Sequence, residues 1–315
     1  MKYRHLGDAG TQVSAISLGG WINFEGQGKV PADEARRTIE RAYTLGINFF
    51  DVADVYGQGE AEKQVGGILK QYPRHTLVIS TKVFWPMSDE VNDQGLSRKH
   101  IYESINKSLQ RLGTDYVDIY FCHRFDPQTP ILETAWIMHD LIQQGKVLYW
   151  ATSEWSGAQI AEAVAVCEKY GLHKPQVEQP NYSLLHRKIV DTAVAPVAIK
   201  NGIGLTVFSP LAMGMLTGKY DDGVPDDSRF AKEPWAKNQS VHDENVQKVR
   251  LLKPIADSLH ITRAQLALAW ILHQPGISSV ITGATRPSQI EDNVKAVDVN
   301  LSNDVLSQLD AIFPA

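Results

Sequence analysis

Short runs of apolar residues recur along the chain, separated by longer segments in which the apolar residues keep a helical spacing. Most of the runs are continuous rather than alternating, which is typical of parallel strands buried on both faces of a sheet. The pattern therefore predicts eight strands, at residues 13–19, 47–51, 76–82, 116–123, 147–153, 175–179, 203–209 and 277–283.

The segments between these runs carry the start and stop signals of helices. A Ser or Thr stands where a helix N-cap is expected, Gln159 completes a capping box, and a glycine follows the last apolar position. Pro130 takes the first position of one of these helices, where proline is favoured. The predicted N-caps and the glycines that end the same helices are Ser97 and Gly113, Thr129 and Gly145, and Ser156 and Gly171.

Alternating strands and helices over 315 residues predict the α/β class and a closed (β/α)8 barrel, a TIM barrel, as a single domain over residues 1–315. An open doubly wound sheet is the alternative, but no G-x-G-x-x-G follows the first strand to open a helix. The first fifteen residues predict a β-hairpin that turns at residues 8–10 and plugs the lower end of the barrel. Residues 210–243, rich in Gly, Pro and Asp, predict a long loop of the kind that forms lids.

Composition narrows the classes of partner. The net charge of −5 and the lack of a basic run argue against a nucleic-acid or anionic-membrane surface. No apolar stretch is long enough to span a bilayer and the first residues do not resemble a signal peptide, so a cytoplasmic protein is expected. Cys122 and Cys167 have no metal-binding spacing and are expected to be free thiols, and no metal site is predicted.

Polar residues end nearly all of the predicted strands. In a barrel of this kind the active site forms where the strands end, so these side chains are the candidates for chemistry. Tyr56 follows the second strand on a loop that is expected to return over the barrel mouth. The residues at the strand ends are Asp51, Lys82, His123, Ser153, Gln179, Ser209 and Gly283.

Four of these side chains suit proton donation to a developing alkoxide. A nearby ammonium favours the phenolate and lowers a tyrosine pKa, so Lys82 would make Tyr56 a better acid. Asp51 would hold Lys82 in place, and His123 would hydrogen-bond the oxygen that receives the proton. Taken singly, Asp51 and Lys82 also fit a structural ion pair and His123 a core or surface histidine. Their expected co-location favours a functional site.

A second candidate site follows the last strand. Thr285 is predicted to cap a helix that Arg286 and Pro287 open, and a helix N-terminus offers unpaired N–H groups to a phosphate. Arg286 adds a fork of donors suited to a phosphate monoester. The alternative is a capped helix with a surface arginine.

These motifs together resemble the aldo-keto reductase family over essentially the whole chain. The segment GINFFDVADVYGQGEAEKQVG is similar to the first signature of that family and carries Asp51 and Tyr56, while VISTKV and IYFCHRFD carry Lys82 and His123. The resemblance implies an NADPH-binding barrel without a Rossmann fold that reduces aldehydes or ketones by hydride transfer. Tyr56 would be the proton donor, tuned by Lys82 and Asp51, and His123 would orient the substrate.

The resemblance also implies two sets of binding residues. Preference for NADP(H) over NAD(H) is implied by Arg286. Small or aromatic aldehydes are the expected substrates, because aromatic residues, Phe125 among them, follow several strands. The substrate contacts expected from these positions, together with Tyr56 and His123, are Trp21, Tyr56, Phe84, Trp85, His123 and Trp155. The alternative is that several of the aromatic residues shield the nicotinamide from water. The cofactor contacts implied are Trp21, Asp51, Ser153, Gln179, Phe208, Ser209, Leu211, Gly214, Lys219, Arg229, Gly283, Thr285, Arg286, Gln289 and Asn293.

Within the family, the segments GGW, TSEWS, EQPNYSLL and SPLAMG are most similar to the branch that contains the β subunits of voltage-gated potassium channels and their bacterial relatives. That branch commonly assembles as tetramers or larger rings, which implies a homo-oligomer. His123 replaces the asparagine of the channel subunits and favours a working reductase. Glu154 stands where the branch often has Arg. The alternative function is an NADPH-binding regulatory subunit with little turnover.

Overall fold

The computed structural model describes residues 1–21, 30–226, 228–232 and 243–315. Its eight parallel strands close into a barrel, because Val280 in the last strand pairs with Ile16 in the first. The predicted (β/α)8 barrel is confirmed and the open sheet is wrong. The barrel strands are β3 (Ile16–Gly19), β4 (Phe49–Asp51), β5 (Val78–Val83), β6 (Val117–Cys122), β7 (Val147–Ser153), β8 (Val177–Gln179), β9 (Gly204–Val207) and β10 (Ile277–Thr282).

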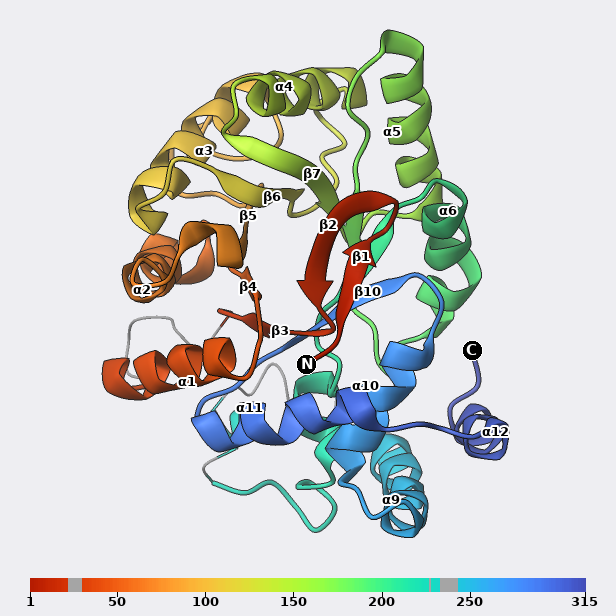
Figure 1. Cartoon of the computed structure of the whole chain (residues 1–315). Coiled ribbons are helices and arrows are strands. Elements are labelled where there is room, and N and C mark those ends of the chain that lie inside the picture. The colour runs from red at the N-terminus through yellow and green to blue at the C-terminus, as the bar shows by residue number, and fades with distance from the viewer. Residues whose placement is uncertain (22–29, 227, 233–242) are drawn as a thin grey trace.

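Helices surround the strands, as Figure 1 shows. Within the described residues no helix combines the length and the apolar character needed to cross a bilayer. The helices are α1 (Ala32–Thr44), α2 (Glu60–Leu69), α3 (Arg98–Leu112), α4 (Ile131–Gln143), α5 (Gly157–Tyr170), α6 (Ala195–Lys200), α7 (Arg229–Lys232), α9 (Asp243–Ser258), α10 (Arg263–His273), α11 (Pro287–Asn293) and α12 (Asn303–Ile312). Shorter helical turns are η1 (Tyr56–Gly59), η2 (Arg74–Thr76), η3 (Val190–Val194), η4 (Ala212–Thr217) and η5 (Val294–Asp298).

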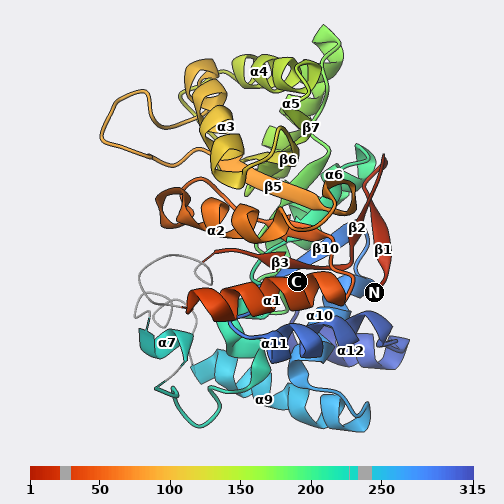
Figure 2. The same ribbon diagram turned by 60° about the vertical axis from the view of Figure 1, so that its left-hand side comes forward.

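An N-terminal hairpin fills one end of the barrel. Strands β1 (Tyr3–Leu6) and β2 (Ala9–Ser14) are antiparallel, and Leu6 and Val13 pack against side chains of the barrel interior such as Phe49 and Phe121. Arg4 donates to the backbone oxygens of Leu272 and Ile277, at 2.7 and 3.0 Å. Figure 2 shows the hairpin and α7 on opposite sides of the barrel. The plug predicted from the sequence is therefore present.

Two details of this region differ from the prediction. The turn comprises residues 7 and 8 rather than 8–10, since Leu6 already pairs with Ala9 across it. Gly7 has φ +58°, a conformation that glycine adopts without strain. The run 13–19 contains parts of two strands, because Ala15 separates β2 from β3. The whole run is buried, so its hydrophobicity alone did not reveal the break.

Most of the predicted helix ends are confirmed. The Ser97 side chain accepts from the backbone N–H of His100, and Ser156 and Gln159 form a complete capping box. Gly113 and Gly171 follow their helices in the left-handed conformation. These residues stabilise helix ends that lie next to the barrel loops.

Thr129 and Thr285 are not the N-caps. Pro130 caps α4, and the Thr129 hydroxyl instead donates to the Asp126 carboxylate at 2.8 Å. Arg286 caps α11, because the residue before a proline is disfavoured in helical conformation and the helix begins at Pro287. The N–H and hydroxyl of Thr285 both donate to the Gln289 side chain. Gly145 lies just beyond the end of α4, as predicted.

The described part of the segment 210–243 contains helices that were not predicted. It contains η4 and α7, and α9 begins at its last residue. Residue 227 and residues 233–242 of this segment lie outside the described residues. In η4 the residues Ala212, Met213 and Gly214 all have positive φ, which turns the backbone sharply after β9.

Candidate active site

An ion pair is buried at the carboxyl end of β4 and β5. The Lys82 ammonium donates to Asp51 Oδ2 at 2.6 Å and to the backbone oxygen of Val52 at 2.8 Å. Asp51 Oδ1 accepts from the Ser80 hydroxyl and the Gln179 amide, at 2.6 and 3.2 Å. Lys82 is fully buried and Asp51 nearly so. The pair is thus held by groups from three strands.

Tyr56 lies directly above this pair. The Lys82 Nζ is 5.1 Å from the centroid of the Tyr56 ring, and the His123 ring meets the same ring edge-on at 5.7 Å between centroids. Tyr56 begins the turn η1, in which Gly57, Gln58 and Gly59 all have positive φ. All four side chains predicted as a catalytic group therefore lie together.

Burial sets the charges of this group. It lowers the pKa of Lys82, and the neighbouring Asp51 carboxylate opposes that shift. Burial, followed by the positive charges of Lys82 and Arg124, holds the pKa of His123 well below its ordinary value. His123 is therefore a neutral imidazole near pH 7 and can donate one hydrogen bond without carrying a charge.

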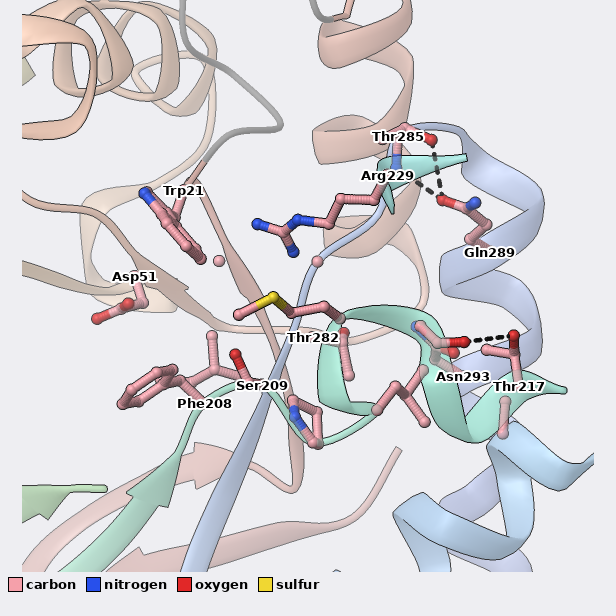
Figure 3. Close-up of a pocket in the computed structure, with 18 of the residues that line it drawn as sticks. Trp21, Asp51, Phe208, Ser209, Thr217, Arg229, Thr282, Thr285, Gln289 and Asn293 are labelled. Carbon is pink, nitrogen blue, oxygen red and sulfur yellow. Dashed lines mark hydrogen bonds between the residues drawn. The ribbon is translucent and has the colours of Figure 1, made fainter. Parts of the chain in front are cut away.

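A cavity of about 1100 Å³ opens over these residues. Figure 3 shows that it is elongated, with Trp21 and Asp51 at one end, Gln289 and Asn293 at the other, and Arg229 between them. The Arg229 guanidinium lies 4.8 Å from the centroid of the Trp21 ring. The predicted residues that line the cavity are Trp21, Asp51, Tyr56, Trp85, His123, Ser153, Gln179, Phe208, Ser209, Leu211, Gly214, Lys219, Arg229, Gly283, Thr285, Arg286, Gln289 and Asn293.

Three predicted site residues do not line the described part of the cavity. Lys82 lies beneath it and contacts Asp51 and Tyr56, which do line the cavity. Trp155 is 2% exposed and packs edge-on against Phe125, with 5.0 Å between ring centroids. Phe84 packs edge-on against Trp85 at 5.1 Å. Phe84 and Trp155 thus pack against neighbouring aromatic rings outside the described lining, which differs from the direct substrate contact expected from their positions after strands.

Several lining residues were missed by the sequence analysis. Thr282, Ser288 and Asp292 lie near the predicted phosphate helix, and the polarity of that segment was an available signal. Arg124 also lines the cavity, one residue past the strand-end histidine. Glu154, whose role was open, is exposed outside the lining of the described cavity. Its carboxylate accepts from the backbone N–H of Asn181 at 2.6 Å and holds the turn after β7.

The cavity fits an elongated anionic nucleotide. Its volume slightly exceeds the range of about 300–1000 Å³ typical of small-molecule sites. Lys219, Arg229 and Arg286 supply positive charge to its lining, and Trp21 and Phe208 supply aromatic surface at the Asp51 end. Gly214 has φ +94° and an added Cβ would lie 2.9 Å from Lys219 Cε, so the backbone approaches the Lys219 side chain closely here.

The protein is thus a closed (β/α)8 barrel with an N-terminal hairpin as a plug and a polar site where its strands end. The chain matches the model of the Aldo/keto reductase family over residues 15–313 and belongs to that family. Membership indicates an NAD(P)H-dependent oxidoreductase, and members of the family typically bind NADPH.

Relatives are known in plants. The chain is 48% identical over 304 residues to a protein of Arabidopsis thaliana described as "Probable voltage-gated potassium channel subunit beta", covering 95% of this chain and 92% of the relative. It is 45% identical over 319 residues to a protein of Oryza sativa subsp. japonica with the same description, covering 99% and 96%. The predicted likeness to channel β subunits is thereby confirmed.

Proposed function

We propose that this protein reduces aldehydes or ketones to alcohols with NADPH, and that Tyr56 is the proton donor. The observation that carries the proposal is the buried Lys82–Asp51 pair beneath the Tyr56 ring, beside a neutral His123. Asp51, Tyr56 and His123 line a cavity that is large enough for a dinucleotide, and Lys82 lies beneath them.

The chemistry assigned to the chain is transfer and stabilisation of one proton. NADPH, when bound, supplies a hydride to the carbonyl carbon. Tyr56 gives its phenolic proton to the carbonyl oxygen as negative charge develops there, and the Lys82 ammonium stabilises the phenolate that remains. Asp51 fixes the position of Lys82 through the 2.6 Å contact. His123 holds the substrate oxygen by donating one hydrogen bond.

The same proposal assigns the cofactor contacts. Ser153 and Gln179 would hold the nicotinamide carboxamide. The Gln179 side-chain amide donates one N–H to Asp51, and its oxygen can accept from another partner. Phe208 would stack on the ring. Ser209, Leu211, Gly214, Lys219 and Arg229 would surround the pyrophosphate. Gly283, Thr285, Arg286, Gln289 and Asn293 would hold the adenosine end, with Arg286 favouring the 2′-phosphate of NADP.

Replacement of the phenol tests the proposal. Tyr56→Phe is expected to bind NADPH normally, measured by quenching of intrinsic fluorescence, and to lose about 100-fold or more of its turnover of a test aldehyde. Tyr170→Phe is the matched control, because Tyr170 is 44% exposed on α5 and should keep full activity. Undiminished turnover in Tyr56→Phe would eliminate the proposed acid.

The relatives favour a second candidate, an NADPH-binding regulatory subunit with little turnover. Its supporting observation is the identity of 45% or more to proteins described as channel β subunits. A single-turnover measurement separates the two: bound NADPH that stays reduced with every aldehyde offered would support the regulatory subunit. We also propose a homo-oligomer, a tetramer or larger, for either function. Light scattering of the purified protein measures the number of subunits directly.

A further inference from the structure

Arg124 places a positive charge at the carbonyl end of the cavity. It directly follows His123 after β6, is half-buried and lines the cavity. Its guanidinium carbon lies 5.7 Å from the centroid of the Trp85 ring, and that ring lies 6.3 Å from the His123 ring. Arg124, Trp85 and His123 therefore form one wall next to Tyr56, which we call the β6 wall.

The charge of Arg124 has no counter-ion in the described part of the chain. One of its N–H groups donates to the backbone oxygen of His123, and none of the ion pairs among described residues includes it. The carboxylate nearest in sequence, Asp126, accepts instead from the N–H groups of Leu96 and Gln128 and from the Thr129 hydroxyl.

The two carboxylates that line the described part of the cavity are engaged by other groups. Asp51 is engaged by Lys82, Ser80 and Gln179, so its charge is balanced by the lysine ammonium. Asp292 accepts from Gln265 at 2.7 Å, on the side of α11. The positive charge of Arg124 reaches the reacting groups, because it contributes to the lowered pKa values of both His123 and Lys82. Arg124 thus brings to the carbonyl end a positive charge that the proposed proton transfer does not use.

A half-buried guanidinium beside an aromatic ring suits a small planar or tetrahedral anion. Arg retains donors beyond the one given to the His123 oxygen, and these match carboxylate or phosphate oxygens. We propose that Arg124 binds an anionic group of the substrate, and that the substrates are small aldehydes or ketones that carry a carboxylate or a phosphate. The proposal rests on the proposed reductase function and adds the class of substrate to it.

Two aldehydes of similar size, one anionic and one neutral, test this class. We compare 4-carboxybenzaldehyde with its methyl ester in steady-state assays with NADPH, because both have the same ring with the substituent at the same position. The ester is the more electrophilic aldehyde, so a preference for the acid is not explained by intrinsic reactivity. The expected kcat/KM is about 10- to 100-fold higher for the acid, the range of a charge-assisted hydrogen bond. Most of the difference should lie in KM, since the anion is bound equally before and during reaction.

Substitutions assign the preference to Arg124. Arg124→Gln should bring the ratio of kcat/KM values, acid over ester, close to one, and Arg124→Lys should give an intermediate ratio. Arg98→Gln is the control, because it makes the same change in net charge at an exposed residue paired with Asp140. If Arg98→Gln lowers the ratio as much as Arg124→Gln, the effect is general charge steering and the proposal fails.

Further measurements on the unaltered protein keep the proposal testable if Arg124→Gln does not fold. Benzoate should inhibit ester reduction at a concentration about tenfold or more below that of benzamide. A comparison of kcat/KM for glyceraldehyde 3-phosphate and for glyceraldehyde tests the phosphate separately. A preference for either the carboxylate or the phosphate supports the proposed class of anionic substrates. Reduction of the ester with no preference for either anion overturns the role of Arg124 and leaves the reductase intact. Reduction of none of these aldehydes refutes the reductase itself.

Discussion

Two adjacent glycines in α2 allow a sharp test of how tightly the helices around the site pack. Gly66 faces α3, and a Cβ added there would lie 2.2 Å from the backbone oxygen of Leu112 and 2.6 Å from its Cα. Gly67 is exposed and an added Cβ would meet nothing within 4 Å. Replacing either one by alanine makes the same chemical change at neighbouring positions of one helix.

The expected effects have opposite signs. Alanine stabilises a helix interior by about 0.5–1 kcal/mol relative to glycine, and for Gly67→Ala this is the whole effect. For Gly66→Ala the new Cβ must move by about 1.2 Å to reach the 3.4 Å of ordinary contact. Because its neighbours are backbone atoms that cannot rotate away, the two helices must separate, at a cost of about 1–3 kcal/mol or more.

Urea unfolding followed by far-UV circular dichroism measures both variants. The helix propensity cancels in the comparison, so Gly66→Ala should be less stable than Gly67→Ala by about 1–3 kcal/mol, seen as a lower midpoint with an unchanged slope. If Gly66→Ala proves as stable as Gly67→Ala, then α2 and α3 are not in close backbone contact.

Two further predictions concern buried charges close to the same helix. Arg111→Ala should lower the free energy of unfolding in urea by about 3–5 kcal/mol, because it leaves the fully buried Glu62 carboxylate without its 2.5 Å partner. Arg98→Ala breaks an exposed pair with Asp140 and should lower it by about 1 kcal/mol or less, so equal losses in the two variants would contradict the prediction. Burial, and then the nearby Glu62, raises the pKa of Asp54 to about 7, above the value of about 3.9 in an unfolded chain. The folded protein therefore binds more protons between about pH 4 and 7, and Asp54 makes stability fall as pH rises through that window, by at most about 1.4 kcal/mol per pH unit. Asp54→Asn should remove this pH dependence, so the stability of the variant relative to wild type should increase from pH 5 to pH 7. If the difference in stability between variant and wild type does not vary with pH, Asp54 keeps an ordinary pKa.

The strands could be predicted from the sequence because a barrel strand is buried on both faces, and continuous apolar runs report that burial directly. The helix caps at Ser97 and Ser156 followed from local hydrogen bonds within one turn. The same reasoning misplaced Thr129, whose hydroxyl is engaged by Asp126 in a loop. That competing partner depends on loop geometry, which no spacing rule contains.

The predicted residues that line the site could be found from the position of strand ends and from family resemblance. The backbone turns and packed aromatic residues around them could not be predicted in the same way. Ala212 and Met213 adopt positive φ without being glycines, so the turn of η4 had no sequence signal. Phe84 and Trp155 follow strands as Trp85 does, yet their side chains point into packing rather than into the cavity. Which aromatic residue faces a ligand is decided by the loop backbone.

The N-terminal hairpin ties together segments that the ribosome makes at opposite ends of synthesis. Lys2 donates to the backbone oxygen of Val297, and Arg4 to those of Leu272 and Ile277. At the roughly 5–20 residues per second of translation, β3 waits on the order of 10–50 seconds for β10, which forms one of its two neighbours in the barrel. During that interval the nascent chain presents an unpaired strand edge beside a hairpin whose Leu6 and Val13 pack against the barrel interior in the folded protein. This is the stage at which aggregation or chaperone capture would compete with folding.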